Sequence, residues 1–187
     1  GAFTGAVRDR EGRVEAADGG TLFLDETGEL TPPLQAQLLR FLQDHAFERL
    51  GETRTRHANV RVVAAINRDP DAEAASGRFR LDLFYRLSVV DVRIPSLRER
   101  PEDLPGLAEH LIEQAARRLG RATPTLSEDA LALLLAHSWP GNVRELSNEL
   151  ERALVLSNGA MLEVDHLSER IRSAAPRAPQ LGGPFTL

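Results

Sequence analysis

Short apolar runs in the first half of the chain predict three strands. The runs are Thr21–Leu24, Val60–Ile66 and Ser88–Ile94. Val60–Ile66 is apolar at almost every position apart from Arg61, which is typical of a strand that is covered on both faces of a parallel sheet. The pattern therefore predicts an α/β domain built on a parallel sheet.

The segments between these runs show either apolar residues at helical spacing or turn residues. Apolar side chains at intervals of three and four residues predict an amphipathic helix over Pro32–His45, with Thr31 as its N-cap and a proline in its first turn. Phe47–Asn59 is polar and contains a glycine, so it predicts a hairpin-like loop. Arg78–Leu87 is expected to be helical, and Gly1–Arg13 is expected to be a loop because it is rich in glycine.

The proline-bounded, Arg-rich segment Pro95–Pro101 marks the clearest boundary in the chain. Beyond it, the spacing of apolar residues predicts only helices. The first has an apolar face that includes Leu104 and Leu119, and Gly120 follows it as the C′ residue. Ser127 is expected to cap the second helix, whose first turn carries two acidic residues that suit the helix dipole.

Two further helices complete the predicted second half. One is expected to start at Asn142, which has capping-box spacing to Glu145, and Asp165 could cap a short fourth helix. Ser173–Leu187 is rich in Pro, Gly and Ala and is expected to be a disordered tail or linker. The predicted domains are an α/β subdomain over residues 1–98, a helical subdomain over 99–172 and a flexible tail over 173–187.

Composition narrows the class of protein. The 187 residues, 42% hydrophobic and 27% charged, are typical of a globular protein with one domain or a medium domain and a small companion. The sequence shows neither an export signal nor an apolar run near the roughly 20 residues of a membrane helix. The absence of Cys excludes disulfides and thiolate metal sites. The net charge of −5 argues against a DNA-binding domain.

Polar side chains follow two of the predicted strands directly. Asp25 and Glu26 end the first apolar run, at the strand end where open α/β sheets bind ligands. Adjacent carboxylates there suit nucleotide hydrolysis, because one can coordinate Mg²⁺, usually through water, while the other orients the attacking water. Asn67 ends the next run and could hold a water or a phosphate oxygen without adding charge. The plain alternatives are a solvated acidic turn and an Asx turn.

Three sequence strings together resemble one family, the AAA+ activators of sigma-54 RNA polymerase, which are also called bacterial enhancer-binding proteins. The first is the hexapeptide Gly1, Ala2, Phe3, Thr4, Gly5 and Ala6. The second is Gly-Gly-Thr-Leu-Phe-Leu-Asp-Glu over residues 19–26, and the third is Trp-Pro-Gly-Asn-Val-Arg-Glu-Leu over residues 139–146. The resemblance is nearly continuous to about Ile171. Thr27 is a departure, since the family usually has Ile there, and this replacement should be tolerated.

The resemblance implies an α/β fold: part of an AAA+ P-loop NTPase parallel sheet, followed by a small all-helical lid. All 23 basic residues are Arg, so the chain cannot contain a P-loop lysine. The P-loop and the first two strands of the family's sheet are expected to precede Gly1. In the family's strand order 5-1-4-3-2, Ser88–Ile94 and Val60–Ile66 would flank the first strand. We therefore expect this fragment alone to be an inactive ATPase.

Arg80 and Arg86 resemble the arginine fingers of the family, with which one protomer reaches the nucleotide of the next. Arginine suits this role because its planar charge persists at any pH and can bridge phosphate oxygens. Considered alone, two arginines on an exposed helix are usually solvated or paired with acidic neighbours. Asn67 looks like sensor I, and Asp25 and Glu26 look like the acidic pair that holds Mg²⁺ and activates water.

Arg144 resembles sensor II, which senses the γ-phosphate; an ion pair with Glu145 or Glu149 is the alternative. The hexapeptide contains no catalytic side chain, and in the family it crowns a mobile loop that engages the sigma factor when ATP is bound. A buried turn is the plain alternative for this segment. Phe47–Asn59 would correspond to the loop before sensor I.

The resemblance also implies cofactors and partners. These are ATP and Mg²⁺, sigma-54 RNA polymerase, and other copies of the protein in a cytoplasmic hexameric ring. DNA would be bound only through a helix-turn-helix C-terminal to this chain, and no membrane is involved. Two alternatives stay open: another AAA+ remodeller, such as a helicase loader or chaperone-like unfoldase, and a catalytically inactive regulator that binds the sigma factor or DNA.

Overall fold

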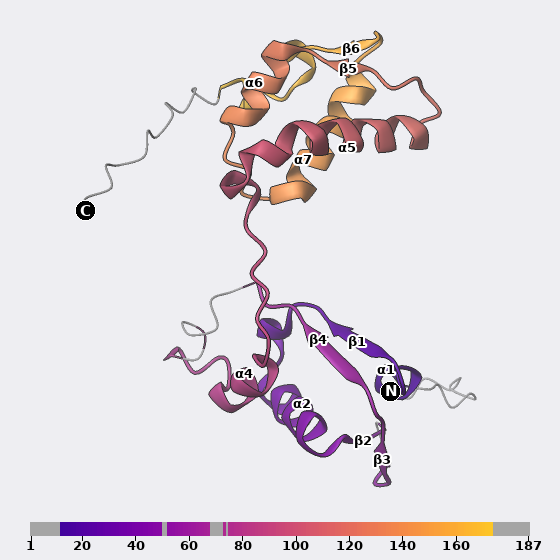
Figure 1. Ribbon diagram of the computed structural model, residues 1–187, viewed down its shortest axis with the longest axis vertical. Helices are drawn as coiled ribbons and strands as arrows, with labels where there is room; N and C mark the ends of the chain where they lie inside the picture. Colours follow the sequence, from indigo (N-terminus) through magenta and orange to yellow (C-terminus); the bar gives the residue numbers. More distant parts are fainter. Residues whose placement is uncertain (1–11, 50–51, 68–72, 74, 174–187) are drawn as a thin grey trace, which may run out of the picture. The chain divides into compact units, whose positions relative to one another are not determined.

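The computed structural model describes residues 12–49, 52–67, 73 and 75–173. These residues belong to two compact units that divide between Val92 and Arg93 (Figure 1). The predicted tail over 173–187 lies almost wholly outside the described residues, as does the expected loop before Gly12. In the described part of the chain, no helix is long and apolar enough to span a membrane.

The first unit alternates short helices and strands. In chain order its described elements are α1 (Arg13–Ala16), β1 (Thr21–Leu24), the 3₁₀ turn η1 (Thr27–Glu29), α2 (Pro32–Asp44), β2 (Ala46–Glu48), β3 (Thr55–His57), β4 (Arg61–Ala64) and α4 (Leu81–Leu87).

A parallel strand pair, β1 with β4, forms the framework of the first unit. Its register places Thr21 opposite Arg61 and Leu24 opposite Ala64. Alternate residues of the two strands are half-buried against α1, α2 and the hairpin, around a small core of Phe41, Ala58 and Val60. The opposite face is open, since Phe23 is 60% exposed and Val63 is 39% exposed. The expectation that the Val60–Ile66 strand is covered on both faces is therefore wrong for this structure.

The third predicted strand does not form. Ser88–Ile94 follows α4 as a turn and then an irregular segment, with Val89, Val90, Val92 and Ile94 each about 80% exposed. A strand needs a neighbour that accepts and donates its backbone hydrogen bonds. In the described part of the chain β4 pairs only with β1, so this apolar run has no strand beside it.

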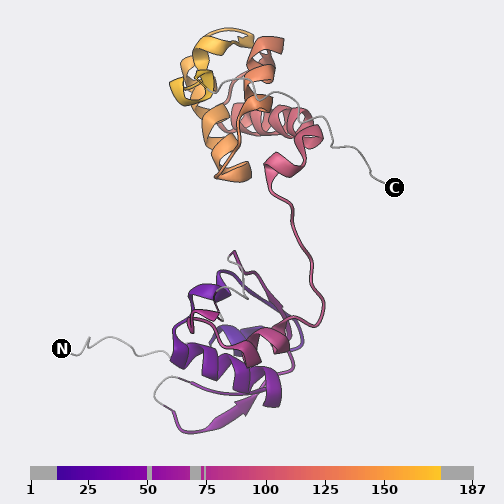
Figure 2. The same cartoon turned by 90° about the vertical axis from the view of Figure 1, so that its left-hand side faces the viewer.

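The hairpin and the α2 helix are confirmed. Phe47–Asn59 contains most of the antiparallel pair β2–β3, with Phe47 opposite Arg56, and the hairpin lies next to α2 (Figure 2). Thr31 is the N-cap of α2, although its side chain makes no capping hydrogen bond. The short helix α1 was not expected.

The predicted helix over Arg78–Leu87 starts three residues late. Arg80 has extended backbone angles, φ −79° and ψ 128°, and is the N-cap of α4, which begins at Leu81. The backbone of Arg78 and Arg80 is instead bonded to a side chain of α2, Gln35, and this keeps the segment extended.

The second unit is mainly helical. Its elements are the 3₁₀ turns η2 (Leu97–Glu99) and η3 (Pro101–Asp103), α5 (Leu104–Arg118), β5 (Thr125–Leu126), α6 (Glu128–Ala136), α7 (Asn142–Leu156), β6 (Met161–Leu162), the 3₁₀ turn η4 (Val164–His166) and α8 (Glu169–Arg172).

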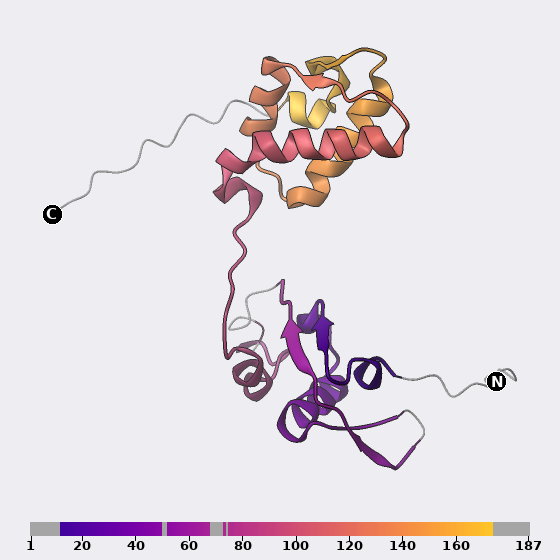
Figure 3. The same ribbon diagram turned by 45° about the vertical axis from the view of Figure 1, so that its right-hand side comes forward.

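The core of the second unit lies between α5, α6 and α7, and α5 crosses α7 (Figure 3). It contains Leu104, Leu134, Leu146 and Leu150, each at most 1% exposed. Leu97, from the Pro95–Pro101 segment, also packs into this core, so part of the predicted linker is structured within the helical unit.

The caps of α5 and α6 are confirmed. Gly120 has φ +63°, and its N–H donates to the carbonyl of Arg117, while the Arg121 N–H donates to Ala116. These two bonds form a Schellman motif, which needs a residue that adopts positive φ at the C′ position. The Oγ of Ser127 accepts the N–H of Ala130 at 3.2 Å and caps α6.

Three expectations about the second unit are wrong. First, the unit is not all helix, because β5 and β6 form a two-residue parallel pair. Second, Asp165 lies inside η4, and the short last helix is preceded by Ser168. Third, Asn142 and Glu145 do not form a capping box, in which each side chain would accept the backbone N–H of the other residue. The Asn142 side chain instead accepts the Leu97 N–H, and the Glu145 side chain accepts the Gly141 N–H.

Candidate functional site

An acidic turn, Asp25–Glu26, directly follows β1. Glu26 has left-handed backbone angles, φ 52° and ψ 40°, and its N–H donates to the Oδ1 of Asp25 at 2.9 Å. Both side chains are exposed. The strand ends at Leu24 and a 3₁₀ turn starts at Thr27, so the two exposed carboxylates lie at the carboxyl end of the strand.

The acidic turn is tied to the end of the neighbouring strand through Thr27. Thr27 is 1% exposed, and both its N–H and its Oγ1 donate to the carbonyl oxygen of Ala65 at 3.0 Å. The Ala65 N–H donates in turn to Leu24 at 2.8 Å. Asn67 follows two residues after Ala65 and is exposed. The carboxyl ends of β1 and β4 therefore present Asp25, Glu26 and Asn67 along one edge.

The donor set at this edge suits one kind of metal. Within the described ranges, no group of three or more His, Cys, Asp or Glu side chains is placed to hold a metal ion by itself. Mg²⁺ commonly uses one or two carboxylates and completes its shell with water and substrate phosphates. The exposed carboxylate of Asp25 fits a Mg²⁺ ion that arrives with a nucleotide.

Arg80 precedes α4 with an exposed side chain that is paired locally. Its Nε and Nη2 donate to the two oxygens of Asp82 at 3.0 and 2.6 Å. The hydrogen bond and charge of Arg80 lower the pKa of Asp82, and Asp82 raises the pKa of Arg80 further. Both side chains are 49% exposed, so the guanidinium is accessible to a phosphate.

Arg86 lies on α4 and makes a different contact. Its Nε and Nη2 donate to the carbonyl oxygen of Leu42 at 3.3 and 3.1 Å, within the last turn of α2. A cation at a helix C-terminus is favourable because the carbonyls there carry partial negative charge. The described contacts of Arg80 and Arg86 thus leave both guanidinium groups at the surface.

A buried glutamine holds the segment that carries Arg80, and the sequence reasoning missed it. Gln35 lies in the first turn of α2, is 1% exposed, and bonds the backbone of Leu30, Arg78 and Arg80. The sequence shows three Gln in an amphipathic helix, at positions 35, 37 and 43, and does not distinguish the buried amide from the exposed ones. Asp82 was also missed, although its separation of two residues from Arg80 was visible.

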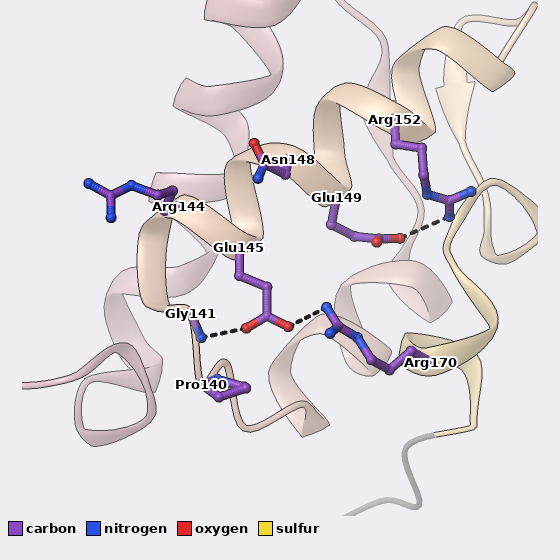
Figure 4. Close-up of a pocket in the computed structure, with 8 residues that line it drawn as sticks. All are labelled: Pro140, Gly141, Arg144, Glu145, Asn148, Glu149, Arg152 and Arg170. Carbon is purple, nitrogen blue, oxygen red and sulfur yellow. Dashed lines mark hydrogen bonds and ion pairs between the residues drawn. The ribbon is translucent and has the colours of Figure 1, made fainter.

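A hollow of about 520 Å³ lies at the start of α7 in the helical unit (Figure 4). Its lining residues are Pro140, Gly141, Arg144, Glu145, Asn148, Glu149, Arg152 and Arg170. Glu145 accepts the Gly141 N–H at 2.7 Å and also binds Arg170. Gly141 has no space for a larger residue, since an added Cβ would lie 2.8 Å from the Glu145 Cβ.

Arg144 does not form the alternative ion pair with Glu145 or Glu149. Glu149 binds Arg152 at 3.1 Å and accepts the Ser168 N–H at 2.6 Å, while Glu145 is bound as described above. Figure 4 shows the guanidinium of Arg144 pointing away from both carboxylates. Among the residues that the structure describes, none forms a hydrogen bond or ion pair with Arg144, and its side chain is exposed.

Glu149 is the buried carboxylate of the hollow. Burial by itself raises the pKa of this carboxyl, but the bonds from the Ser168 N–H and from Arg152 outweigh it and lower the pKa below the ordinary value. Glu149 is therefore ionised at neutral pH and holds the α7 helix to the turn before α8.

The hexapeptide of residues 1–6 lies outside the described residues.

Two family models cover nearly the whole chain. Residues 1–93 match the Sigma-54 interaction domain, and residues 98–183 match the AAA+ ATPase lid domain. The class that the fold and the acidic strand end define is thus an AAA+ domain with its lid: an α/β fold with part of the parallel sheet, followed by a mainly helical unit. Within that class, the chain belongs to the family of sigma-54-dependent activators, and the family predicted from the sequence is confirmed.

The relatives agree with this assignment. A Nif-specific regulatory protein of Azotobacter vinelandii is 51% identical over 185 residues, which are 99% of this chain and 35% of that protein. The alginate biosynthesis regulator AlgB of Pseudomonas aeruginosa is 48% identical over 187 residues, 100% of this chain and 42% of that protein.

A solved structure shows the same fold. The crystal structure of NtrX from Brucella abortus in complex with ADP superposes with a TM-score of 0.84 at 40% identity, and covers 92% of this chain and 40% of NtrX. The complex of the same protein with ATP gives 0.83. The chain thus spans between about a third and two fifths of the length of these proteins.

Proposed function

We propose that the protein containing this chain is a Mg²⁺-dependent ATPase that remodels the closed promoter complex of sigma-54 RNA polymerase. The observation that carries this proposal is the edge formed by Asp25, Glu26 and Asn67, whose strands are tied together by the bonds of Thr27 to Ala65. The match to the Sigma-54 interaction domain supports the choice of partner.

The proposed chemistry divides the work between the two carboxylates. Asp25 binds Mg²⁺ through water, and Glu26 orients the water that attacks the γ-phosphorus. Asn67 holds a water or a γ-phosphate oxygen as sensor I. ATP would be bound mainly by a P-loop segment ahead of Gly1, since the chain contains no Lys.

The arginines complete the site across protomers. We assign Arg80 and Arg86 to the nucleotide of the next protomer in a hexameric ring, and Arg144 to γ-phosphate sensing as sensor II. An arginine finger contributes roughly 10³ to 10⁵ in rate in comparable phosphoryl transfer, so hydrolysis should depend on ring assembly. The exposed guanidinium groups of all three arginines support this assignment.

The hexapeptide of residues 1–6 is proposed to contact the sigma factor in the ATP-bound state. DNA binding is assigned to a helix-turn-helix C-terminal to this chain, and the machine acts in the cytoplasm, where RNA polymerase transcribes. NtrX was solved with ADP and with ATP, which supports nucleotide binding by this fold.

Substitution of Glu26 tests the proposed hydrolysis. In the full-length protein, Glu26→Gln should bind ATP and hydrolyse it at least 100-fold more slowly, because the attacking water loses its orienting carboxylate. Glu109→Gln, an exposed glutamate of the helical unit, is the matched control and should hydrolyse ATP at the wild-type rate. Phosphate release is the measurement, and wild-type turnover by Glu26→Gln would refute the assignment of the catalytic carboxylate.

Substitution of the hexapeptide tests the sigma-factor partner separately. Thr4→Ala and Phe3→Ala should keep ATPase activity within a few-fold, because neither side chain is an acid, a base or a metal ligand. Both should lose binding to sigma-54 in the presence of a transition-state analogue, and with it open-complex formation. If both variants bind and activate normally, the general AAA+ remodeller becomes the better description.

A further inference from the structure

We propose that Gln35 is a positioning residue that holds Arg80 in place for the nucleotide of the neighbouring protomer. The proposal rests on the proposed function, because it assumes that Arg80 acts across the protomer interface. Gln35 itself touches no nucleotide in this scheme and acts only through the backbone that carries Arg80.

The side-chain amide of Gln35 is bonded to backbone groups of two separate segments. Its Nε2 donates to the carbonyl oxygens of Leu30 and Arg78, both at 2.8 Å. Its Oε1 accepts the N–H of Arg80 at 2.9 Å. With 1% exposure, the amide is shielded from water, so these three bonds have no solvent substitute. The amide therefore fixes both the position and the direction of the chain at Arg80.

The same set of hydrogen bonds also reaches the acidic turn. The Leu30 N–H donates to the carbonyl of Thr27 at 3.3 Å, and Thr27 is bonded to Ala65 at the end of β4. Hydrogen bonds thus run without interruption from the strand end that carries Asp25 and Glu26, through Gln35, to the backbone of Arg80. Each protomer links its own catalytic edge to the finger that it offers to the next protomer.

The bonds of Gln35 hold the backbone of Arg80 and leave its side chain exposed. The guanidinium is exposed and contacts Asp82 in the same surface segment. It can exchange that carboxylate for a phosphate without any change in the bonds of Gln35. A finger anchored in this way loses little rotational freedom when it engages a nucleotide, which is the benefit of pre-organisation.

A purely structural role for Gln35 makes a different prediction. Loss of the amide leaves three backbone groups without partners and lowers stability in either case. A positioning role additionally requires that the loss in turnover depend on Arg80 and appear in the site of the neighbouring protomer. Those two properties separate the roles.

The first experiment is a double-mutant cycle in the full-length protein with Gln35→Ala, Gln35→Met, Arg80→Ala and the combination of Gln35→Ala with Arg80→Ala. A finger misplaced by about 1 Å should cost on the order of 100-fold in kcat, with the KM for ATP changed less than about threefold. Gln35→Ala should have no further effect once Arg80 is Ala. Gln37→Ala, an exposed glutamine of the same helix, is the control and should retain wild-type turnover.

The second experiment mixes protomers. Rings of Gln35→Ala with Glu26→Gln protomers should recover turnover, because a protomer with intact Glu26 can receive Arg80 from a protomer with intact Gln35. If Gln35 acted only on its own acidic turn, no mixing ratio would restore activity. Absence of recovery, with mixed rings shown to form, therefore overturns the proposal.

The remaining outcomes also decide between the two roles. If Arg80→Ala turns over at the wild-type rate, the proposed arginine finger fails, and the inference about Gln35 fails with it. If Arg80→Ala is slow but both Gln35 variants are normal, only the positioning role is refuted. If neither Gln35 variant folds or assembles while Gln37→Ala does, Gln35 belongs to the fold alone, and the proposal is overturned.

Discussion

Substitution of Asn142 should destabilise the helical unit, and the size of the effect should depend on the replacement. Asn142 begins α7 with φ +50°, and its Oδ1 accepts the Leu97 N–H at 2.8 Å. Leu97 is 1% exposed and packs into the core of the unit. One side chain thus joins the segment before α5 to the helix that carries Arg144, and it does so from a backbone conformation that Asn tolerates well.

The structure separates two contributions to this effect. Loss of the acceptor leaves the Leu97 N–H unpaired beside a buried side chain, at a cost of about 1–3 kcal/mol. A residue with a Cβ but no local hydrogen bond costs roughly a further 1–2 kcal/mol in the left-handed region. Asn142→Gly should therefore lose about 1–3 kcal/mol and Asn142→Ala about 2–5 kcal/mol. Asn142→Asp keeps the acceptor, suits the start of a helix, and should stay within about 1 kcal/mol of wild type.

Urea unfolding followed by Trp139 fluorescence measures these differences. Trp139 is the only Trp of the chain and is 2% exposed in the helical core, so its emission reports on this unit. Asn148→Ala is the matched control on the same helix; Asn148 is exposed, and Ala should be neutral or slightly stabilising there. Equal stability of the Ala and Gly variants would refute the strain argument, and wild-type stability of both would refute the bond.

Two further changes test the buried contacts. The pKa of Glu149 is lowered in the folded state, so the stability it contributes is present above its ordinary pKa of 4.5 and is lost as the pH falls through the folded value. Glu149→Gln should remove that part of the acid dependence of Trp139-detected unfolding; an unchanged pH profile would contradict this. Thr27→Val should cost only about 0.5–1.5 kcal/mol in unfolding followed by circular dichroism, because Ala65 still accepts the Thr27 N–H. A larger loss would show that the hydroxyl does more than bond one carbonyl.

The sequence predicted most reliably those features that depend on neighbouring residues. The α2 helix, the hairpin and the caps at Gly120 and Ser127 follow from local rules about helical spacing, turns and helix ends. The parallel pairing of β1 with β4 agrees with the parallel sheet that the apolar runs predict. These are the parts of the fold in which a short segment largely determines its own conformation.

Features that depend on distant partners were missed or wrong. Ser88–Ile94 has the composition of a strand, but strand formation needs a neighbour, and the described residues supply none. Asn142 was expected to cap its own helix, yet it bonds to Leu97, 45 residues earlier. The burial of Gln35 likewise depends on contacts with residues 43 and 45 positions away. No local pattern contains the information that selects such contacts.

The three candidate phosphate-binding arginines differ in what they must release before they bind a phosphate. Arg144 has no bonded partner among the described residues, Arg86 donates to a neutral carbonyl, and Arg80 is held by a carboxylate. The pairing of Arg80 with Asp82 would be an obstacle if the pair were buried, but both side chains are half exposed. Exposed ion pairs contribute little to stability and are weakened by salt.

A nucleotide phosphate in a closed interface is a stronger competitor for Arg80 than Asp82 is. It carries more charge than one carboxylate, and its oxygens accept the same paired N–H donors in an environment from which water is largely excluded. If Arg80 is the proposed arginine finger, Asp82 would restrain the guanidinium before the interface forms without retaining it afterwards. Because Gln35 would hold the backbone of Arg80 in both situations, the proposed exchange from Asp82 to phosphate would require only side-chain rotation.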